Sequence, residues 1–160
     1  MKKLVTILVA LTIILCIGSA MAWSSAPTTS NTGTLNSTGI TVNFGANGIK
    51  SSIDTPKCYT GITSYTMKAR DLYLANNSIK KPTVTLEINY WSTSHNQWEA
   101  GSKESVLLGA TNVKTSSGTY IPSKKTVSSS LSASSSKYYY GIFKKDYTSI
   151  AMYGNFWFHN

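Results

Sequence analysis

The sequence is poor in the residues on which small exported proteins and enzymes usually depend. Of its 160 residues only two are cysteine and two are histidine. Only Cys58 lies beyond residue 22, so an intrachain disulfide is excluded there, and core packing and backbone hydrogen bonds have to hold the fold. We expect the Cys58 thiol to be buried as a small apolar group, with intermolecular pairing as the alternative.

Histidine and carboxylate side chains are too scattered to indicate a catalytic or metal site. His95 and His159 lack metal-ligand spacing, and no G-x-S-x-G, phosphate-binding loop or dinucleotide fingerprint occurs. Cys58 and His95 are the one thiol–imidazole pairing, without a family signature. Glu87 and Glu99 lie near tryptophans, as an acid pair for sugar hydrolysis would, but solubilising charges opposite lysines are the plainer interpretation. The sequence therefore predicts a protein that is not an enzyme, with no metal and no cofactor.

One long apolar run occurs, and it stands at the N-terminus. Two lysines precede a run at 4–17, and Ala20-Met21-Ala22 is an A-x-A cleavage site. This pattern predicts a signal peptide over residues 1–22 and a secreted, extracellular protein, with a leader of bacterial style. Lipidation of Cys16 is the alternative, although bulky Leu15 stands where a small residue is typical. Because no second run of spanning length follows, no transmembrane segment is expected after cleavage.

Positive charge dominates the remaining chain, and nearly all of it is lysine. Without Lys2 and Lys3, 13 of the 15 basic residues remain against 6 acidic ones, a net charge of +7. Arg70 is the one arginine. Arginine is the residue suited to forked phosphate or base recognition, and no basic cluster occurs, so we expect no nucleic acid among the partners. A cell-wall polymer or a membrane surface, both anionic, is the expected partner of an exported cationic protein.

The remaining chain divides into an arm and one domain. Residues 23–37 are rich in Ser, Thr and Asn with almost nothing to bury, which predicts a flexible arm. Residues 38–160 carry short alternating stretches, the clearest at 83–91, and the tight-turn pair Asn47-Gly48 predicts a hairpin. Little helical periodicity occurs. We therefore predict an all-β fold, a small antiparallel β-sandwich of immunoglobulin-like or bacteriocin-like type.

The C-terminal region is aromatic on both faces of its two predicted strands. The segments 137–145 and 149–159 are joined near Asp146, which predicts an aromatic C-terminal hairpin. In the second segment, Tyr153 and Trp157 have the opposite parity to its other large apolar residues. Docking of this strand into the core is the plain interpretation, and an aromatic row that faces water would instead be a platform for sugar rings or a protein.

Aromatic side chains also gather in the stretch 90–98, "YWSTSHNQW". Its serine, asparagine and glutamine side chains add the hydroxyls and amides that shallow carbohydrate sites use, although capping of the sandwich end is an alternative role. The candidate ligand-binding residues are therefore Tyr90, Trp91, His95, Trp98, Tyr153 and Trp157.

The closing segment "YGNFWF" at 153–158 resembles the aromatic C-terminus of small secreted β-sandwich bacteriocins of the lactococcin 972 type. Positive charge, export and the lack of disulfides are also similar. The resemblance implies a toxin-like action on a competitor's cell envelope. Three functions stay open: binding to an anionic bacterial cell envelope or its glycans, which leads; a lactococcin-972-like bacteriocin; and a self-assembling structural or surface subunit that associates through strand edges.

Overall fold

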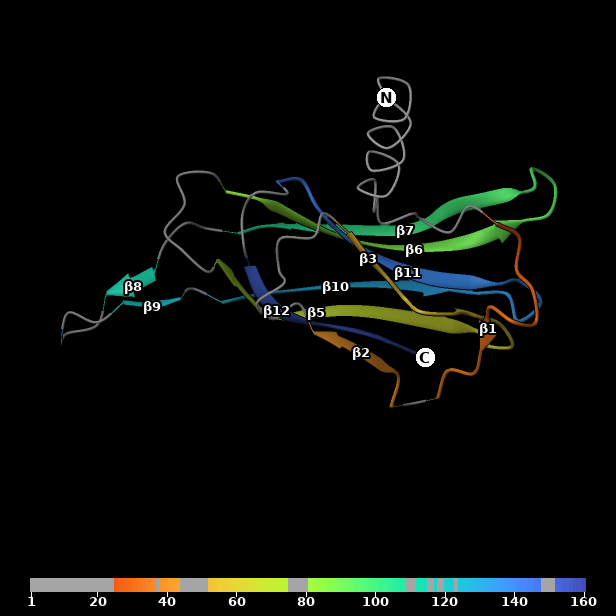
Figure 1. Cartoon of the computed structure of the whole chain (residues 1–160), viewed down its shortest axis with the longest axis horizontal. Helices are drawn as coiled ribbons and strands as arrows, with labels where there is room; N and C mark the ends of the chain where they lie inside the picture. Colours follow the sequence, from red (N-terminus) through yellow and green to blue (C-terminus); the bar gives the residue numbers. More distant parts are fainter. Residues whose placement is uncertain are drawn as a thin grey trace, which may run out of the picture.

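Two β-sheets face each other in layers, as the computed structural model shows (Figure 1). The structure describes residues 25–36, 38–43, 52–74, 81–108, 112–114, 117, 120–122, 124–147 and 152–160. These residues contain strands and turns, and none belongs to a helix capable of crossing a membrane. The predicted all-β sandwich is confirmed.

The larger sheet has six strands. Its path is β1-β4-β11-β6-β7, and β3 pairs with β11 beside this path. The strands are β1 (Thr32–Gly33), β3 (Ser52–Asp54), β4 (Cys58–Tyr59), β6 (Thr83–Ser92), β7 (Gln97–Leu107) and β11 (Tyr139–Lys145). β1 and β4 pair in parallel, whereas the other described pairs of this sheet are antiparallel.

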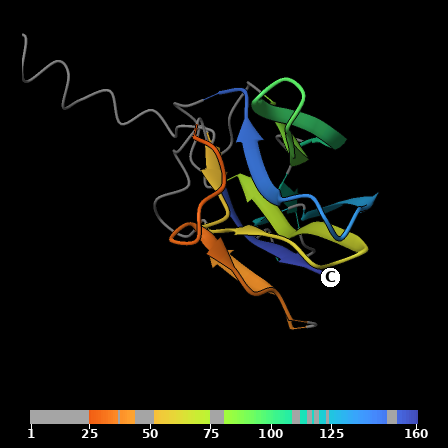
Figure 2. The same ribbon diagram turned by 90° about the vertical axis from the view of Figure 1, so that its right-hand side faces the viewer.

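The smaller sheet has four antiparallel strands in the order β10-β5-β12-β2. They are β2 (Ile40–Asn43), β5 (Ser64–Leu74), β10 (Lys125–Ser132) and β12 (Met152–His159). Seen from the side, β2 lies at one edge of the molecule and β7 at the opposite edge (Figure 2). A separate hairpin of β8 (Asn112–Lys114) and β9 (Tyr120–Pro122) projects beyond the layers (Figure 1).

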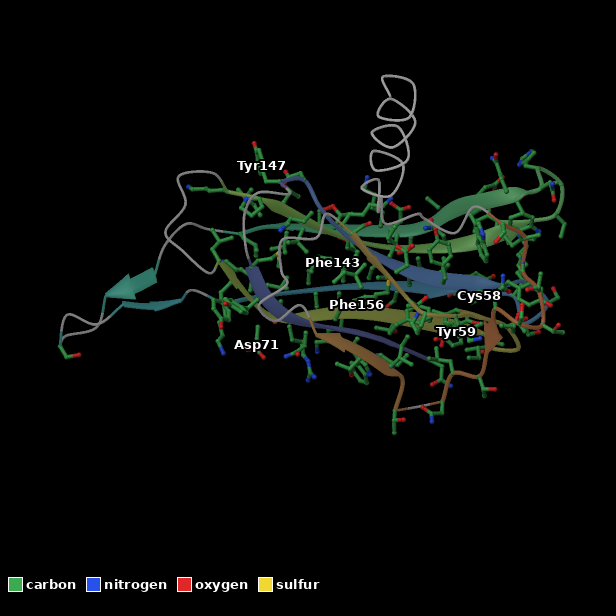
Figure 3. All side chains as sticks on the ribbon, in the orientation of Figure 1. Cys58, Tyr59, Asp71, Phe143, Tyr147 and Phe156 are labelled. Atoms are coloured by element: carbon green, nitrogen blue, oxygen red, sulfur yellow. The ribbon has the colours of Figure 1, made fainter. Side chains whose placement is uncertain are left out.

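Apolar side chains at every second position of the strands fill the space between the sheets. Val84, Leu86 and Ile88 of β6 are fully buried there, as the alternation over 83–91 predicts. The ring of Phe143 from β11 lies 6.3 Å from that of Phe156 in β12, so the two layers meet through aromatic contacts (Figure 3). Burial of these side chains is the main force that holds the sandwich together.

The two C-terminal strands do not form the predicted hairpin. β11 pairs with β6, β4 and β3, whereas β12 pairs with β5 and β2 in the other sheet. β11 is apolar on both faces because it is central: Tyr140 and Ile142 on its outer side form a second small cluster with Cys58. A strand buried on both sides is typical of the middle of a sheet. The predicted Asn47-Gly48 turn lies outside the described residues, and the strands on either side of it, β2 and β3, also belong to different sheets.

The N-terminal segment differs from the flexible arm that composition predicts. β1 pairs with β4, and Leu35 is buried in the main core. The backbone N–H of Cys58 donates to the Asn31 carbonyl at 3.0 Å, and its thiol is buried as expected, with a pKa raised by that burial. Backbone groups make most of these contacts. A prediction from the number of apolar side chains therefore does not detect that the segment is held to the sheet.

Candidate functional site

The six predicted binding residues separate onto three surfaces, and Trp91 and Trp98 occupy the first. They are paired across β6 and β7 on the outer face of the larger sheet. Trp91 is only 7% exposed, and the Trp98 ring meets the rings of Trp91 and Tyr140 edge-on at 5.4 and 4.8 Å. The Trp98 indole N–H donates to the Ser25 carbonyl at 3.0 Å. Trp98 therefore packs the N-terminal segment onto the sheet and is itself half-buried, whereas Trp91 has little free ring surface.

Tyr90 and His95 both contact Glu99 at one end of the sandwich: Tyr90 lies on the inner side of the larger sheet, and His95 lies exposed in the turn between β6 and β7. The Tyr90 hydroxyl donates to Glu99 at 2.5 Å, and His95 Nδ1 contacts the other carboxylate oxygen. These two hydrogen bonds, the one from Tyr90 foremost, lower the pKa of Glu99 to about 2. Ser92 Oγ approaches the same Nδ1 atom at 3.4 Å. Because Ser92 and Glu99 contact one nitrogen of the His95 ring, these residues do not form a catalytic relay, which would use both nitrogens. The network fixes Tyr90 and Glu99 in place.

Glu87 and Glu99 point to opposite faces of the larger sheet. Glu87 lies on the outer face, where Lys144 Nζ approaches its carboxylate at 2.9 Å. Glu99 is paired with Tyr90, whose side chain packs against the main core. The two carboxylates therefore do not flank a common substrate position, as an acid pair for sugar hydrolysis must.

Asp54, on the same outer face, makes stability depend on pH. Burial raises its pKa to about 6, partly offset by Lys144, and its Oδ1 atom has no hydrogen-bond partner among the described residues. Because the folded pKa exceeds the unfolded one, the folded protein binds more protons between about pH 4 and pH 6, and stability falls as pH rises through that window. Asp54→Asn removes the buried charge. We expect the variant to be about 1–2 kcal/mol more stable than the wild type above pH 7, a value reduced because solvent reaches part of the carboxyl group.

Urea unfolding of Asp54→Asn and wild type at pH 7.5 and at pH 3.5 measures this difference. At pH 3.5 the folded Asp54 carboxyl is neutral and the unfolded one mostly so, and the free energies of unfolding of the two proteins should therefore agree to within about 0.5 kcal/mol. A difference of equal size at both pH values would show that the carboxylate charge is not its cause.

Tyr153 and Trp157 occupy the outer face of the smaller sheet. Their inward neighbours Met152, Phe156 and Phe158 are buried, so the parity predicted for this strand is confirmed. The Tyr153 ring stacks on that of Tyr73 from β5 at 5.2 Å, and the Trp157 ring stacks on His159 at 3.9 Å. All four rings are half-buried. Each ring thus retains surface for a ligand while a neighbour restricts its motion.

Two cations lie beside these rings. Arg70 Cζ is 5.7 Å from the centre of the Trp157 ring, and Lys124 Nζ is 6.0 Å from the centre of the Tyr73 ring. Lys124 also approaches Asp71 at 3.4 Å, with both side chains more than half exposed. Such an exposed pair contributes little to stability, so the positive charges remain available to a ligand. We define the aromatic–cationic face by the residues Arg70, Tyr73, Lys124, Tyr153, Trp157 and His159.

A β-bulge in β5 brings Tyr73 onto the face that Arg70 already occupies by the alternation of the preceding residues. Both neighbouring strands shift register against β5 there: Asn155 of β12 is opposite Arg70 although Tyr153 is opposite Tyr73, and β10 shifts in the same region. Asp71 has a left-handed backbone conformation, with φ of 55°, which Asp adopts more readily than most residues. Its side chain points away from the layers (Figure 3). Bulges often re-aim side chains beside functional sites, and this one exposes two successive charged residues.

Gly39 lets β2 approach Trp157 closely. Its φ is 66°, and a Cβ atom there would lie 2.5 Å from the Phe158 carbonyl oxygen and 2.7 Å from Trp157 Nε1. The Trp157 N–H donates to the neighbouring Thr38 carbonyl at 2.8 Å. We expect Gly39→Ala to lower the free energy of unfolding by about 2–4 kcal/mol, because backbone strain and a clash with backbone atoms add together.

Gly61→Ala is the matched control for Gly39→Ala. Gly61 also has a positive φ, 80°, but a Cβ atom there meets nothing within 4 Å. Its substitution should therefore cost only the backbone strain, about 1 kcal/mol. Urea unfolding of both variants, followed by tryptophan fluorescence, tests the difference. Equal losses in the two variants would mean that close contact at Gly39 is not required.

Sequence reasoning missed Arg70, Tyr73 and Lys124. A signal for the bulge is present, because the apolar parity of Tyr65, Met67 and Ala69 shifts by one residue before Leu72 and Leu74. Tyr73 and Tyr153 meet through strand register, which no local pattern specifies. Among the described residues, no three His, Cys, Asp or Glu side chains gather as metal ligands.

Comparison with known proteins finds weakly similar structures and no match in sequence. No protein-family model and no curated protein matches the chain. One similar structure is that of the CBM22-1–GH10 modules of Clostridium thermocellum endo-1,4-β-D-xylanase 10B complexed with xylohexaose (14% identity, TM-score 0.38), where the match covers 62% of this chain and 17% of that one. A second is CBM28, a carbohydrate-binding module specific for non-crystalline cellulose (11% identity, TM-score 0.38), with 76% and 72% covered. These scores are too low to support an argument about function.

Proposed function

We propose that the protein is exported and binds anionic glycan polymers of a bacterial cell envelope through the aromatic–cationic face. One observation carries this proposal: on the outer face of the smaller sheet, Arg70 and Lys124 lie within 6.0 Å of the centres of the Trp157 and Tyr73 rings. Aromatic rings pack against the apolar faces of sugars, and adjacent cations attract the carboxylates or phosphates that such polymers carry.

The face is suited to an extended, repeating ligand. The stacked pairs Tyr73–Tyr153 and Trp157–His159 lie at successive positions along β12, with Arg70 between them in register. A polymer that runs along the strand meets ring, cation and ring in turn. Because each ring is already stacked, less side-chain freedom is lost on binding than with mobile aromatics.

The charge balance of the face favours an anion. Arg70, Lys124 and half-buried Lys68, which is opposite Trp157, are basic, whereas Asp71 is the acidic residue that lies beside them. The net charge of +7 that remains without Lys2 and Lys3 acts in the same direction. A long-range attraction of this kind accelerates association and weakens as salt is added.

Sedimentation with purified bacterial cell walls tests the proposal. The protein from Trp23 onward contains every strand that the structure describes, so it is the form to use. It is mixed with walls before and after extraction of their anionic polymers, over a series of salt concentrations. We expect binding to intact walls that falls steeply between about 0.05 and about 0.5 M salt, and little binding to extracted walls.

Binding that survives both extraction and salt would indicate that the ligand is a neutral wall glycan and not an anionic polymer. Failure to bind either preparation would refute envelope binding. The bacteriocin and self-assembly functions stay predictions from the sequence.

A further inference from the structure

A second surface with the chemistry of a binding site lies at one end of the sandwich, away from the aromatic–cationic face. It is a cleft of about 480 Å³ between β6, β7, β10 and the turn that leads into β11. Its lining includes Tyr90, Gly101, Leu131, Ser134, Lys137 and Tyr139. The volume lies within the range of small-ligand pockets and has room for one or two sugar rings.

The walls of the cleft are held in place before any ligand arrives. The backbone N–H of Ser134 donates to the Tyr139 hydroxyl at 2.8 Å, and that of Lys137 donates to the Ser134 carbonyl at 3.1 Å. Tyr90 is fixed on the opposite side by its hydrogen bond to Glu99. These contacts anchor the turn between β10 and β11 to the larger sheet, so little ordering is left to accompany binding.

A bulge with a glycine shapes the floor. Ser102 is opposite Ile88 and Ala100 is opposite Asn89, so Gly101 is the extra residue of β7. A Cβ atom at Gly101 would lie 2.7 Å from Leu131 Cδ2 and 3.3 Å from Tyr90 Cδ1. Because glycine stands there, β7 approaches the half-buried Leu131 and Tyr90 side chains closely, and their apolar surfaces line the cleft.

The charges at the cleft balance across one ring. Lys137 Nζ lies 4.4 Å from the centre of the Tyr90 ring, and the hydroxyl of the same ring donates to the Glu99 carboxylate. An ammonium group held over a ring keeps N–H donors for a ligand hydroxyl, and Ser134 Oγ adds a group that both donates and accepts. One cation and one anion leave no net charge to attract a polyanion.

We propose that this cleft binds a neutral saccharide, one or two rings at the end of a glycan chain. Leu131 and Tyr90 pack against the apolar C–H surface of a sugar ring, while Lys137 and Ser134 form hydrogen bonds with its hydroxyl groups. The site goes beyond the proposed function, because it uses other residues and a ligand without charge. Its binding is therefore insensitive to salt, whereas binding at the aromatic–cationic face is not.

Titration of the protein with cellobiose and with N,N′-diacetylchitobiose, followed by backbone amide chemical shifts, tests the cleft. We expect saturable shifts at Gly101, Leu131 and Ser134 with at least one disaccharide, of equal midpoint at about 0.05 and about 0.5 M salt. Lys137→Ala should weaken binding about threefold to fivefold, as the loss of one exposed donor implies. Ser134→Trp should abolish binding by filling the cleft.

Lys103→Ala is the matched control, since Lys103 is exposed on β7 with its side chain on the outer face, opposite Glu87. It should leave the midpoint unchanged. If Ser134→Trp does not give a folded spectrum, Lys137→Ala decides alone. Absence of saturable shifts, a midpoint that Lys137→Ala leaves unchanged, or shifts located at Arg70 and Trp157 would each overturn the proposal. Arg70→Ala leaves disaccharide binding intact, so failure here and failure at the aromatic–cationic face are distinguished.

Discussion

Phe158→Ala is expected to lower the free energy of unfolding by about 3–5 kcal/mol, the largest single loss that we anticipate. The ring is fully buried between the sheets, stacked on Tyr65 at 5.4 Å and next to Tyr59 at 5.6 Å. Gly141 leaves room for it, because a Cβ atom there would lie 3.0 Å from Phe158 Cδ2. Truncation therefore opens a cavity in a place where the surrounding strands are closely packed.

The neighbouring residue provides the contrast. Trp157 lies on the outer face, half-buried, so Trp157→Ala should cost only about 1–2 kcal/mol through lost ring contacts and one hydrogen bond. Chemical unfolding of the two variants side by side measures the difference. Equal losses, or a larger loss for Trp157→Ala, would contradict the assignment of inner and outer faces in β12.

Arg70→Ala is expected to weaken binding to anionic cell walls about 10-fold or more, because a charged hydrogen bond to a ligand contributes about 1.5–3 kcal/mol. The unfolding free energy should change little, since Arg70 is exposed. Arg70→Lys keeps the charge but loses the planar fork, so an intermediate loss of about threefold is expected. Wall sedimentation at a fixed low salt concentration gives the three affinities.

Lys103→Ala again serves as the control, here because it removes one positive charge from the outer face of the other sheet. It should change wall binding by less than about twofold. If Lys103→Ala and Arg70→Ala weaken binding equally, net charge alone would account for the interaction, and the aromatic–cationic face would have no particular role.

Sequence reasoning succeeded wherever a local period was sufficient. Alternation at 83–91 identified the buried side of β6, and the parity of the last strand separated Trp157 from Phe158 before any contact was known. Both results follow from strand geometry, since successive side chains point to opposite faces. The sandwich itself follows from many such strands without helical periodicity.

Prediction from the sequence failed where the pairing of strands that are distant in the sequence determines the structure. Two aromatic segments joined near Asp146 have the sequence pattern of a hairpin, yet β11 and β12 belong to different sheets. The residues that connect them carry no sequence signal that the chain passes from one sheet to the other. Residues that are adjacent in the sequence can also lie apart in the structure. Tyr90 and Trp91 project to opposite faces of the larger sheet, so the aromatic residues of the stretch 90–98 do not form one site. Arg70 reached Trp157 only through the register of β5 against β12.

The most direct test of the account is the mapping of backbone and indole N–H chemical shifts as a purified anionic cell-wall polymer is added at low salt. We predict saturable changes at Lys68, Arg70, Tyr73, Tyr153 and the Trp157 indole, reversed by about 0.5 M salt. Amides on the outer face of the larger sheet should not change. Changes centred on Trp91 and Trp98, or none at all, would contradict the claim that the outer face of β5 and β12 binds the envelope.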